Sequence, residues 1–119
     1  MSKLDYFKSK TEATVSPMDY MQISKANPDK FVLIDVRNAP PQVMKQKIAG
    51  AKHIPLDSLA ERINEIPRDK TIVVYCWEVW CNMAAKAAII LIENGYDVLE
   101  LAGGIGAWNT MNFPVEPVI

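Results

Sequence analysis

Two cysteines separated by five positions form the part of this 119-residue sequence that is best suited to chemistry. Cys76 directly follows the apolar, β-branched run Thr71-Ile-Val-Val-Tyr75, which predicts a strand buried on both faces. Cys81 lies near the end of the loop that follows, and an alanine-rich stretch closed by Asn94-Gly95 predicts a helix with its stop signal. The cysteine pair is therefore expected in a short loop between a buried strand and the N-terminus of a helix.

The position of Cys76 favours nucleophilic chemistry. In an open parallel sheet, ligands bind beyond the carboxyl ends of the strands, where the loop amides and the next helix favour an anion. Because the thiolate is the reactive form of cysteine, we expect this site to lower the pKa of the Cys76 thiol. The expected anion cradle consists of the backbone amides of the loop: Trp77, Glu78, Val79, Trp80, Cys81, Asn82 and Met83. The alternative is that Cys76 is a small buried hydrophobic residue.

The second thiol, Cys81, has two interpretations. It accepts sulfur from Cys76 or resolves an oxidised state of it, or it is a packing residue under the loop. We expect no metal, because two cysteines and the distant His53 do not fill four ligand positions and the spacing is not the usual C-x-x-C. His53 is expected to be a structural histidine.

The remaining side chains of the loop bear on the partner. Trp77 and Trp80 either pack down as an apolar anchor or are displayed to an apolar partner. Glu78 is the only charged residue of the loop, and its negative charge works against a small dianion as substrate.

A possible brace for the loop lies on another strand. Asp35 ends the apolar run Phe31-Val-Leu-Ile-Asp35, and Arg37 follows two residues later. Such a pair can brace a neighbouring loop through charge-assisted hydrogen bonds. The alternative is a surface ion pair of little energetic weight.

The elements that must position these residues alternate between strands and helices. Residues 1–15 form a polar lead that is compatible with a short helix, and residues 16–119 form one domain. Strands are predicted at 31–35, within 50–55, at 71–75 and at 97–101; helices are predicted at 16–27, 43–48, 57–66, 83–94 and 105–111. This alternation predicts an α/β domain with a mostly parallel sheet and right-handed crossovers.

Composition excludes several function classes. A net charge of −1 gives no basic surface for nucleic acid or an anionic membrane. No run approaches the ~20 apolar residues of a membrane span, and the start lacks the apolar core of a signal peptide. We therefore expect a cytoplasmic protein, a monomer or weak homodimer, whose cysteines stay reduced or act in catalysis.

Four motifs, taken in order, resemble the single-domain rhodaneses. They are Asp35-Val-Arg37, Ile48-Ala-Gly-Ala-Lys-His-Ile-Pro55, Val73-Val-Tyr-Cys76 and Leu101-Ala-Gly-Gly-Ile-Gly-Ala-Trp108. The resemblance covers about residues 16–117 and implies a five-stranded parallel sheet with helices on both faces. It also implies a sulfurtransferase without cofactor, in which Cys76 accepts a sulfane sulfur as a persulfide. The sulfur then passes to a small nucleophile or a thiol-bearing protein.

The active loop departs from the usual rhodanese pattern of Cys, two residues, Gly, one residue and Arg. Counted forward from Cys76, Val79 stands at the position of the glycine and Cys81 at the position of the arginine. Counted back from Gly95, Cys81 stands at the position of the glycine and Met83 at that of the arginine. In either alignment the loop lacks a cation. It resembles a branch with Cys-Trp-x-x-x-Cys-Asn, for which thiosulfate is a doubtful donor.

Three functions remain open from the sequence. The favoured one is the sulfurtransferase, and the alternatives are a thiol-disulfide switch of Cys76 and Cys81 or a non-catalytic module that binds through Trp77 and Trp80. A phosphatase is disfavoured, because phosphoryl transfer needs a positive group that this loop does not offer. His53 occupies a usual asparagine place of the family motif and inherits no catalytic role.

Overall fold

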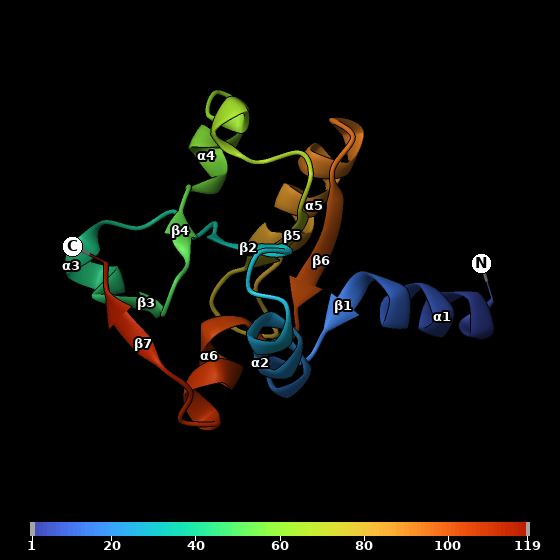
Figure 1. Cartoon of the computed structure of the whole chain (residues 1–119), viewed down its shortest axis with the longest axis horizontal. Helices are drawn as coiled ribbons and strands as arrows, with labels where there is room; N and C mark the ends of the chain where they lie inside the picture. The colour runs from blue at the N-terminus through green and yellow to red at the C-terminus, as the bar shows by residue number, and fades with distance from the viewer. Residues whose placement is uncertain (1, 119) are drawn as a thin grey trace.

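A five-stranded parallel sheet forms the centre of the molecule in the computed structural model, which describes residues 2–118. The strand order is β1-β6-β5-β2-β4, and every neighbouring pair is parallel (Figure 1). The strands are β1 (Thr14–Val15), β2 (Phe31–Asp35), β4 (Lys52–His53), β5 (Thr71–Tyr75) and β6 (Asp97–Leu101). The predicted α/β class and the parallel sheet are confirmed.

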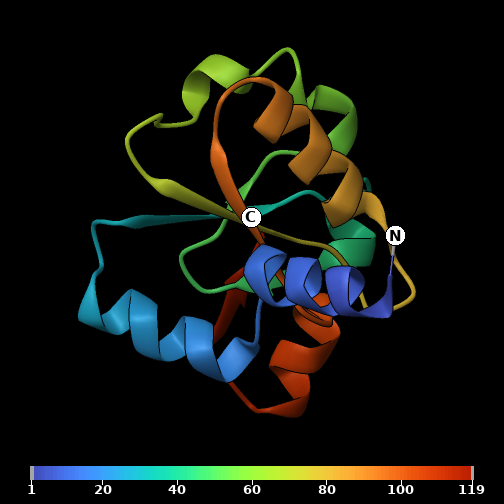
Figure 2. The ribbon, with the colours of Figure 1, turned by 90° about the vertical axis from the view of Figure 1, so that its right-hand side faces the viewer.

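Alternate residues of β5 point into two separate cores, as expected for a strand with period-two geometry and helices on both faces. Ile72 and Val74 belong to the core shared with α4 (Leu56–Leu59) and α5 (Met83–Glu93). Val73 and Tyr75 belong to the core under α2 (Pro17–Ala26) and α6 (Gly104–Thr110). Figures 1 and 2 show these two helix layers on opposite sides of the sheet.

The start of α2 follows its sequence signal. The Ser16 hydroxyl accepts a hydrogen bond of 3.1 Å from the Asp19 N–H, and Pro17 occupies the first helical position. The helix ends at Ala26, just before Asn27-Pro28, because a proline disfavours the helical conformation of the residue before it.

A second, two-stranded sheet was not predicted. β3 (Gln46–Ile48) pairs antiparallel with β7 (Val115–Pro117), at the left of Figure 1. The helix expected at 43–48 is wrong over its last four residues, because α3 (Pro41–Met44) ends before Lys45, whose φ is +24°. The helix expected at 57–66 is interrupted: after α4 only the 3₁₀ turn η1 (Ile63–Glu65) forms. Both differences arise from pairing and packing with distant residues.

The N-terminal lead contains the helix α1 (Lys3–Ala13), which buries none of its residues. Thr14 and Val15, which the sequence prediction assigned to the lead, belong to the sheet as β1 at its edge. Met1 and Ile119, at the ends of the two predicted segments, lie outside the described residues. Within residues 2–118, no helix has the length and apolar character needed to cross a bilayer.

Candidate active site

Cys76 lies one residue beyond the carboxyl end of β5, and only 2% of it is exposed. Its S–H donates to the Cys81 carbonyl oxygen at 3.5 Å, and the N–H groups of Trp77 and Ala84 are directed at its sulfur. The expected lowering of the pKa is wrong for the resting thiol. Burial and the neighbouring Cys81 side chain raise the pKa of Cys76 to about 12, because the two amides only partly offset the loss of water.

Cys81 is a half-buried free thiol whose side chain meets that of Cys76. Burial opposes its ionisation, but hydrogen bonds from the Cys76 thiol and from the N–H groups of Trp77 and Met83 outweigh this and lower the pKa of Cys81. The two thiols therefore titrate as a pair. The proton is held more strongly on Cys76, and the negative charge forms more easily on Cys81.

The thiols open into a cavity of about 310 Å³. Its walls come from the N-terminal helix, the cysteine loop and the segment that follows β6: Tyr6, Lys10, Thr14, Cys76, Glu78, Val79, Cys81, Glu100, Leu101, Ala102, Gly103 and Gly104. Sequence reasoning missed Tyr6, Lys10 and Glu100. No local signal places α1 at the cavity, whereas a glutamate between the apolar residues Leu99 and Leu101 of β6 was a usable signal.

The residues of the predicted anion cradle are placed in different ways. The N–H groups of Trp77 and Met83 face the sulfurs, whereas the Cys81 N–H is used in a turn to the Glu78 carbonyl at 3.0 Å. Asn82 precedes α5 without a side-chain capping bond. Val79 and Trp80, at the tip, are 83% and 72% exposed. Ala84, whose N–H faces Cys76, lies one residue beyond the predicted range.

The start of α6 holds the beginning of the loop. The N–H groups of Ile105 and Gly106 donate to the carbonyl oxygens of Cys76 and Trp77 at 3.0 and 2.9 Å. Gly104 has a φ of +58°, and a Cβ atom there would lie 2.4 Å from the Cys76 carbonyl oxygen. The glycine-rich turn therefore serves close backbone approach to the nucleophile loop.

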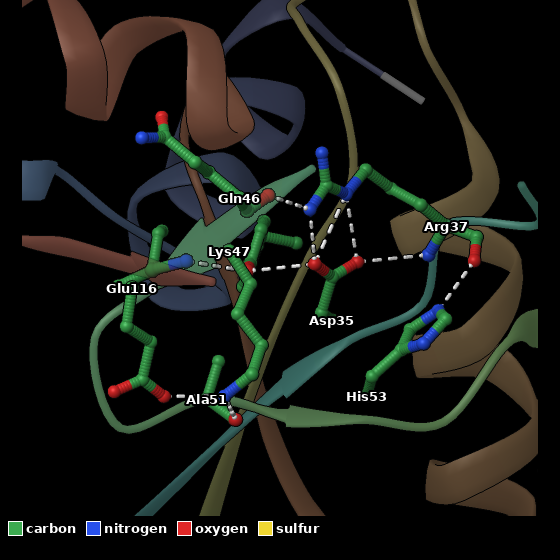
Figure 3. A network of polar contacts seen from close by, with 9 residues as sticks. Asp35, Arg37, Gln46, Lys47, Ala51, His53 and Glu116 are labelled. Atoms are coloured by element: carbon green, nitrogen blue, oxygen red, sulfur yellow. Dashed lines mark hydrogen bonds and ion pairs between the residues drawn. The ribbon is translucent and has the colours of Figure 1, made fainter. Parts of the chain in front are cut away.

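Asp35 and Arg37 form an ion pair, with 2.6 Å between Arg37 Nη2 and Asp35 Oδ2 (Figure 3). The side chains of Asp35 and Arg37 are 0% and 2% exposed, so the pair is buried and the alternative of a surface ion pair is excluded. The Tyr75 hydroxyl donates to Asp35 at 2.8 Å, and Arg37 also donates to the Gln46 carbonyl at 2.7 Å. The guanidinium carbon lies 4.5 Å from the centre of the Trp77 ring. The pair thus links the end of β2 to the first residue after Cys76.

His53 lies away from the thiols and holds the backbone that carries Arg37. Its Nε2 is 2.8 Å from the Arg37 carbonyl oxygen (Figure 3). A carbonyl oxygen only accepts, so Nε2 carries the hydrogen and donates it. Lys47, which is also drawn in Figure 3, pairs with Glu116 and donates to the Ala51 carbonyl, so it is likewise occupied in the structure around β3.

A second cavity, of about 410 Å³, lies on the other side of the cysteine loop. The two tryptophans of the loop, Trp77 and Trp80, line this cavity. The other lining residues are Arg37, Met44, Lys45, Gln46, Glu78, Ile105, Gly106 and Asn109. Trp77 is half-buried under the Arg37 guanidinium, whereas Trp80 is largely exposed. The structure therefore separates the two predicted roles: Trp77 anchors the loop, and Trp80 is displayed. Among residues 2–118 no group of three or more His, Cys, Asp or Glu side chains is placed to hold a metal ion.

Comparison with known proteins agrees with this geometry. Residues 19–111 match the Rhodanese-like domain family. A sulfurtransferase from Allochromatium vinosum is 31% identical over 104 residues, which cover 85% of this chain and 94% of that protein. The thiosulfate sulfurtransferase GlpE of Pseudomonas syringae is 35% identical, with 73% of this chain and 79% of that protein covered.

Solved structures extend the likeness to the whole chain. The crystal structure of a full-length protein from Lactobacillus plantarum superposes with a TM-score of 0.91 at 34% identity and covers 98% of this chain and 97% of that one. The parallel five-stranded sheet of this chain thus has the architecture of that structure. This chain belongs to the rhodanese-like family.

Proposed function

We propose that this protein is a sulfurtransferase that carries a sulfane sulfur as a persulfide on Cys76. The observation that carries the proposal is the setting of Cys76, whose sulfur meets the N–H groups of Trp77 and Ala84 beside a cavity that contains a second thiol. Relatives of this chain are named sulfurtransferases, which supports the same chemistry here.

The reaction is covalent catalysis in two steps. The Cys76 thiolate attacks the outer sulfur of the donor, the donor's S–S bond breaks, and the donor leaves as a thiolate while Cys76 becomes a persulfide. An acceptor thiolate then attacks the outer sulfur and releases Cys76 as a thiolate. The outer sulfur of the persulfide would extend into the cavity of about 310 Å³, where loop amides stabilise its charge.

The charges around the thiols favour a persulfide donor over thiosulfate. Glu78 and Glu100 line the cavity and Lys10 is the cation among its lining residues, so the carboxylates outnumber the positive charge. A dianion is repelled from such a site more strongly than a protonated persulfide. We assign this chain to a branch of the family that has the Cys-Trp-x-x-x-Cys-Asn loop and uses a thiol, small or protein-borne, as its partner.

Mass spectrometry of the intact protein after treatment with cysteine persulfide tests this function. We expect one added sulfur that maps to Cys76, its complete loss in Cys76→Ser, and its retention in Cys81→Ser, which serves as the matched control. If Cys76→Ser transfers sulfur at the wild-type rate, the assignment is wrong.

A reversible disulfide between Cys76 and Cys81 is the second candidate, favoured by the closeness of the two residues, which line one cavity and share a hydrogen bond from the Cys76 thiol to the Cys81 carbonyl. Thiol counting during a redox titration separates it from sulfur carriage. Loss of both thiols within one monomer supports the switch, whereas alkylation of both cysteines after mild oxidant opposes it.

A further inference from the structure

Glu100 lies on the same face of the sheet as Cys76. Glu100 is in register with Val74, and paired residues of neighbouring strands point to the same side. Cys76 follows Val74 by two residues, so it points to that side as well. Neighbouring strands lie about 4.8 Å apart and rise about 3.3 Å per residue, which puts the Cα atoms of Glu100 and Cys76 roughly 8 Å apart.

The Glu100 carboxyl is half-buried in the cavity of the thiols. It makes no hydrogen bond or ion pair with another residue in the described part of the chain, and burial alone raises its pKa. Its charge in turn opposes ionisation of Cys81, which lines the same cavity. A half-buried carboxyl that has no protein partner and lines a cavity with two thiols is placed to exchange protons with a bound molecule.

We propose that Glu100 is the proton carrier of sulfur transfer in this cavity. The inference rests on the proposed function and names a catalytic group for it. Cys76 needs such a group, because its buried thiol must lose a proton before its sulfur can attack.

The protons balance over both steps. As Cys76 attacks the outer sulfur of a protonated persulfide, the Glu100 carboxylate takes the thiol proton, the donor's S–S bond breaks, and the carboxyl returns that proton to the departing thiolate. In the second step Glu100 takes the proton of the acceptor thiol, which attacks the outer sulfur of the Cys76 persulfide. The proton then passes to the released Cys76 thiolate. No oxidant or reductant is consumed.

Other charged and titratable groups also surround Glu100. From α1 come Lys10 and Tyr6, and from the loop Glu78 and Cys81. On α5, which packs against β6, the charged residues Lys86 and Glu93 are exposed and do not line the cavity.

Single-turnover transfer from cysteine persulfide to the protein, followed by mass spectrometry from pH 5 to pH 10, tests the proposal. Glu100→Gln keeps the shape of the side chain but removes the ionisable carboxyl. We expect its rate of sulfur transfer at neutral pH to be about a hundredfold lower than that of the wild type. The deficit should shrink at alkaline pH, where the thiol ionises by itself. Glu100→Asp should recover part of the rate, and Glu93→Gln, which removes the same charge outside the cavity, should match the wild type.

The possible outcomes distinguish a failure of this inference from a failure of the proposed sulfurtransferase function. If the wild type takes up no sulfur on Cys76, the proposed function fails. If sulfur is taken up but Glu100→Gln is as fast as the wild type at every pH, or faster, Glu100 is not the proton carrier and the function stands. A deficit that is equal at every pH indicates a structural role and also overturns the inference. Should Glu100→Gln not fold, the pH profile of Glu100→Asp decides.

Discussion

At the residue scale, the buried pair of Asp35 and Arg37 connects the sheet to the chemistry. Arg37 is held by the carboxylate of Asp35 and by the Gln46 carbonyl, and its planar guanidinium covers the Trp77 ring. A lysine could not reproduce this fork and stacking geometry. The pair therefore fixes Trp77, the residue that directly follows Cys76.

Removing one partner of this pair should be costly. We expect Arg37→Ala to lower the free energy of unfolding by about 3–5 kcal/mol, because the Asp35 charge stays buried and unpaired. Urea unfolding measures this, and Lys52→Ala, which breaks the exposed pair of Lys52 and Glu65, should cost no more than about 1 kcal/mol. Equal losses in the two variants would contradict the role of burial.

The thiol pair makes a prediction about pH. Because the pKa of Cys76 is raised to about 12 and that of Cys81 is lowered, the thiolate forms first on Cys81. Iodoacetamide near pH 8 should modify Cys81 first, and modification of Cys76 should accelerate as the pH rises toward 12. Peptide mapping over time reads both rates. Faster modification of Cys76 than of Cys81 near neutral pH would contradict the prediction that the thiolate forms first on Cys81.

Sequence reasoning named Cys76, Asp35 and Arg37 because strand ends can be read locally, and Cys81 because the loop after such a strand end contains a second thiol. It could not find Lys10, because nothing in the helix that carries it indicates where that helix lies. It also misjudged the Cys76 pKa: the amides were foreseen, but the closure of the loop over the sulfur, which excludes water, depends on packing.

At the element scale, the site depends on a close approach between α6 and the cysteine loop. Two helix N–H groups hold two loop carbonyls, and Gly104 allows the contact. The central strands and α5 could be predicted nearly to the residue, because buried β-branched runs and helix stop signals are local. β3 and β7 could not be predicted, because each forms a strand only by pairing with the other, which is distant in the sequence.

Two glycine substitutions test the close approach between α6 and the cysteine loop. Gly50→Ala, at a φ of +84° with nothing within 4 Å of the new Cβ, should cost only the strain of the left-handed conformation, about 1–2 kcal/mol. Gly104→Ala adds a clash with the Cys76 carbonyl and should destabilise the fold further and slow sulfur loading. Thermal unfolding and loading rates measure both, and equal behaviour of the two variants would argue against a tight contact.

At the scale of the whole molecule, the first and last thirds of the chain meet at the thiols. α1 supplies Tyr6 and Lys10 to the cavity, while the segment after β6 supplies the opposite wall. In Figure 1, α1 extends from β1 at the edge of the sheet, and β1 is attached through β6. The domain boundary predicted at residue 16 therefore divides a single site.

Lys10 should set the charge preference of the cavity. In Lys10→Glu the lining carries three carboxylates and no cation, so alkylation of Cys81 by anionic iodoacetate should slow several-fold relative to neutral iodoacetamide. Lys8→Glu, on the same helix but outside the lining, is the matched control. The ratio of the two alkylation rates is the measurement, and an unchanged ratio in Lys10→Glu would show that Lys10 does not act on the thiols.

The hydrogen bonds from Ile105 and Gly106 to the carbonyls of Cys76 and Trp77 also bear on protein synthesis. A ribosome delivers Cys76 well before it delivers α6, so the nascent chain exposes its reactive sulfur before the backbone that shapes the loop exists. This loop geometry can thus arise only after α6 has been made, and a product terminated before α6 would retain both thiols yet lack the means to organise them.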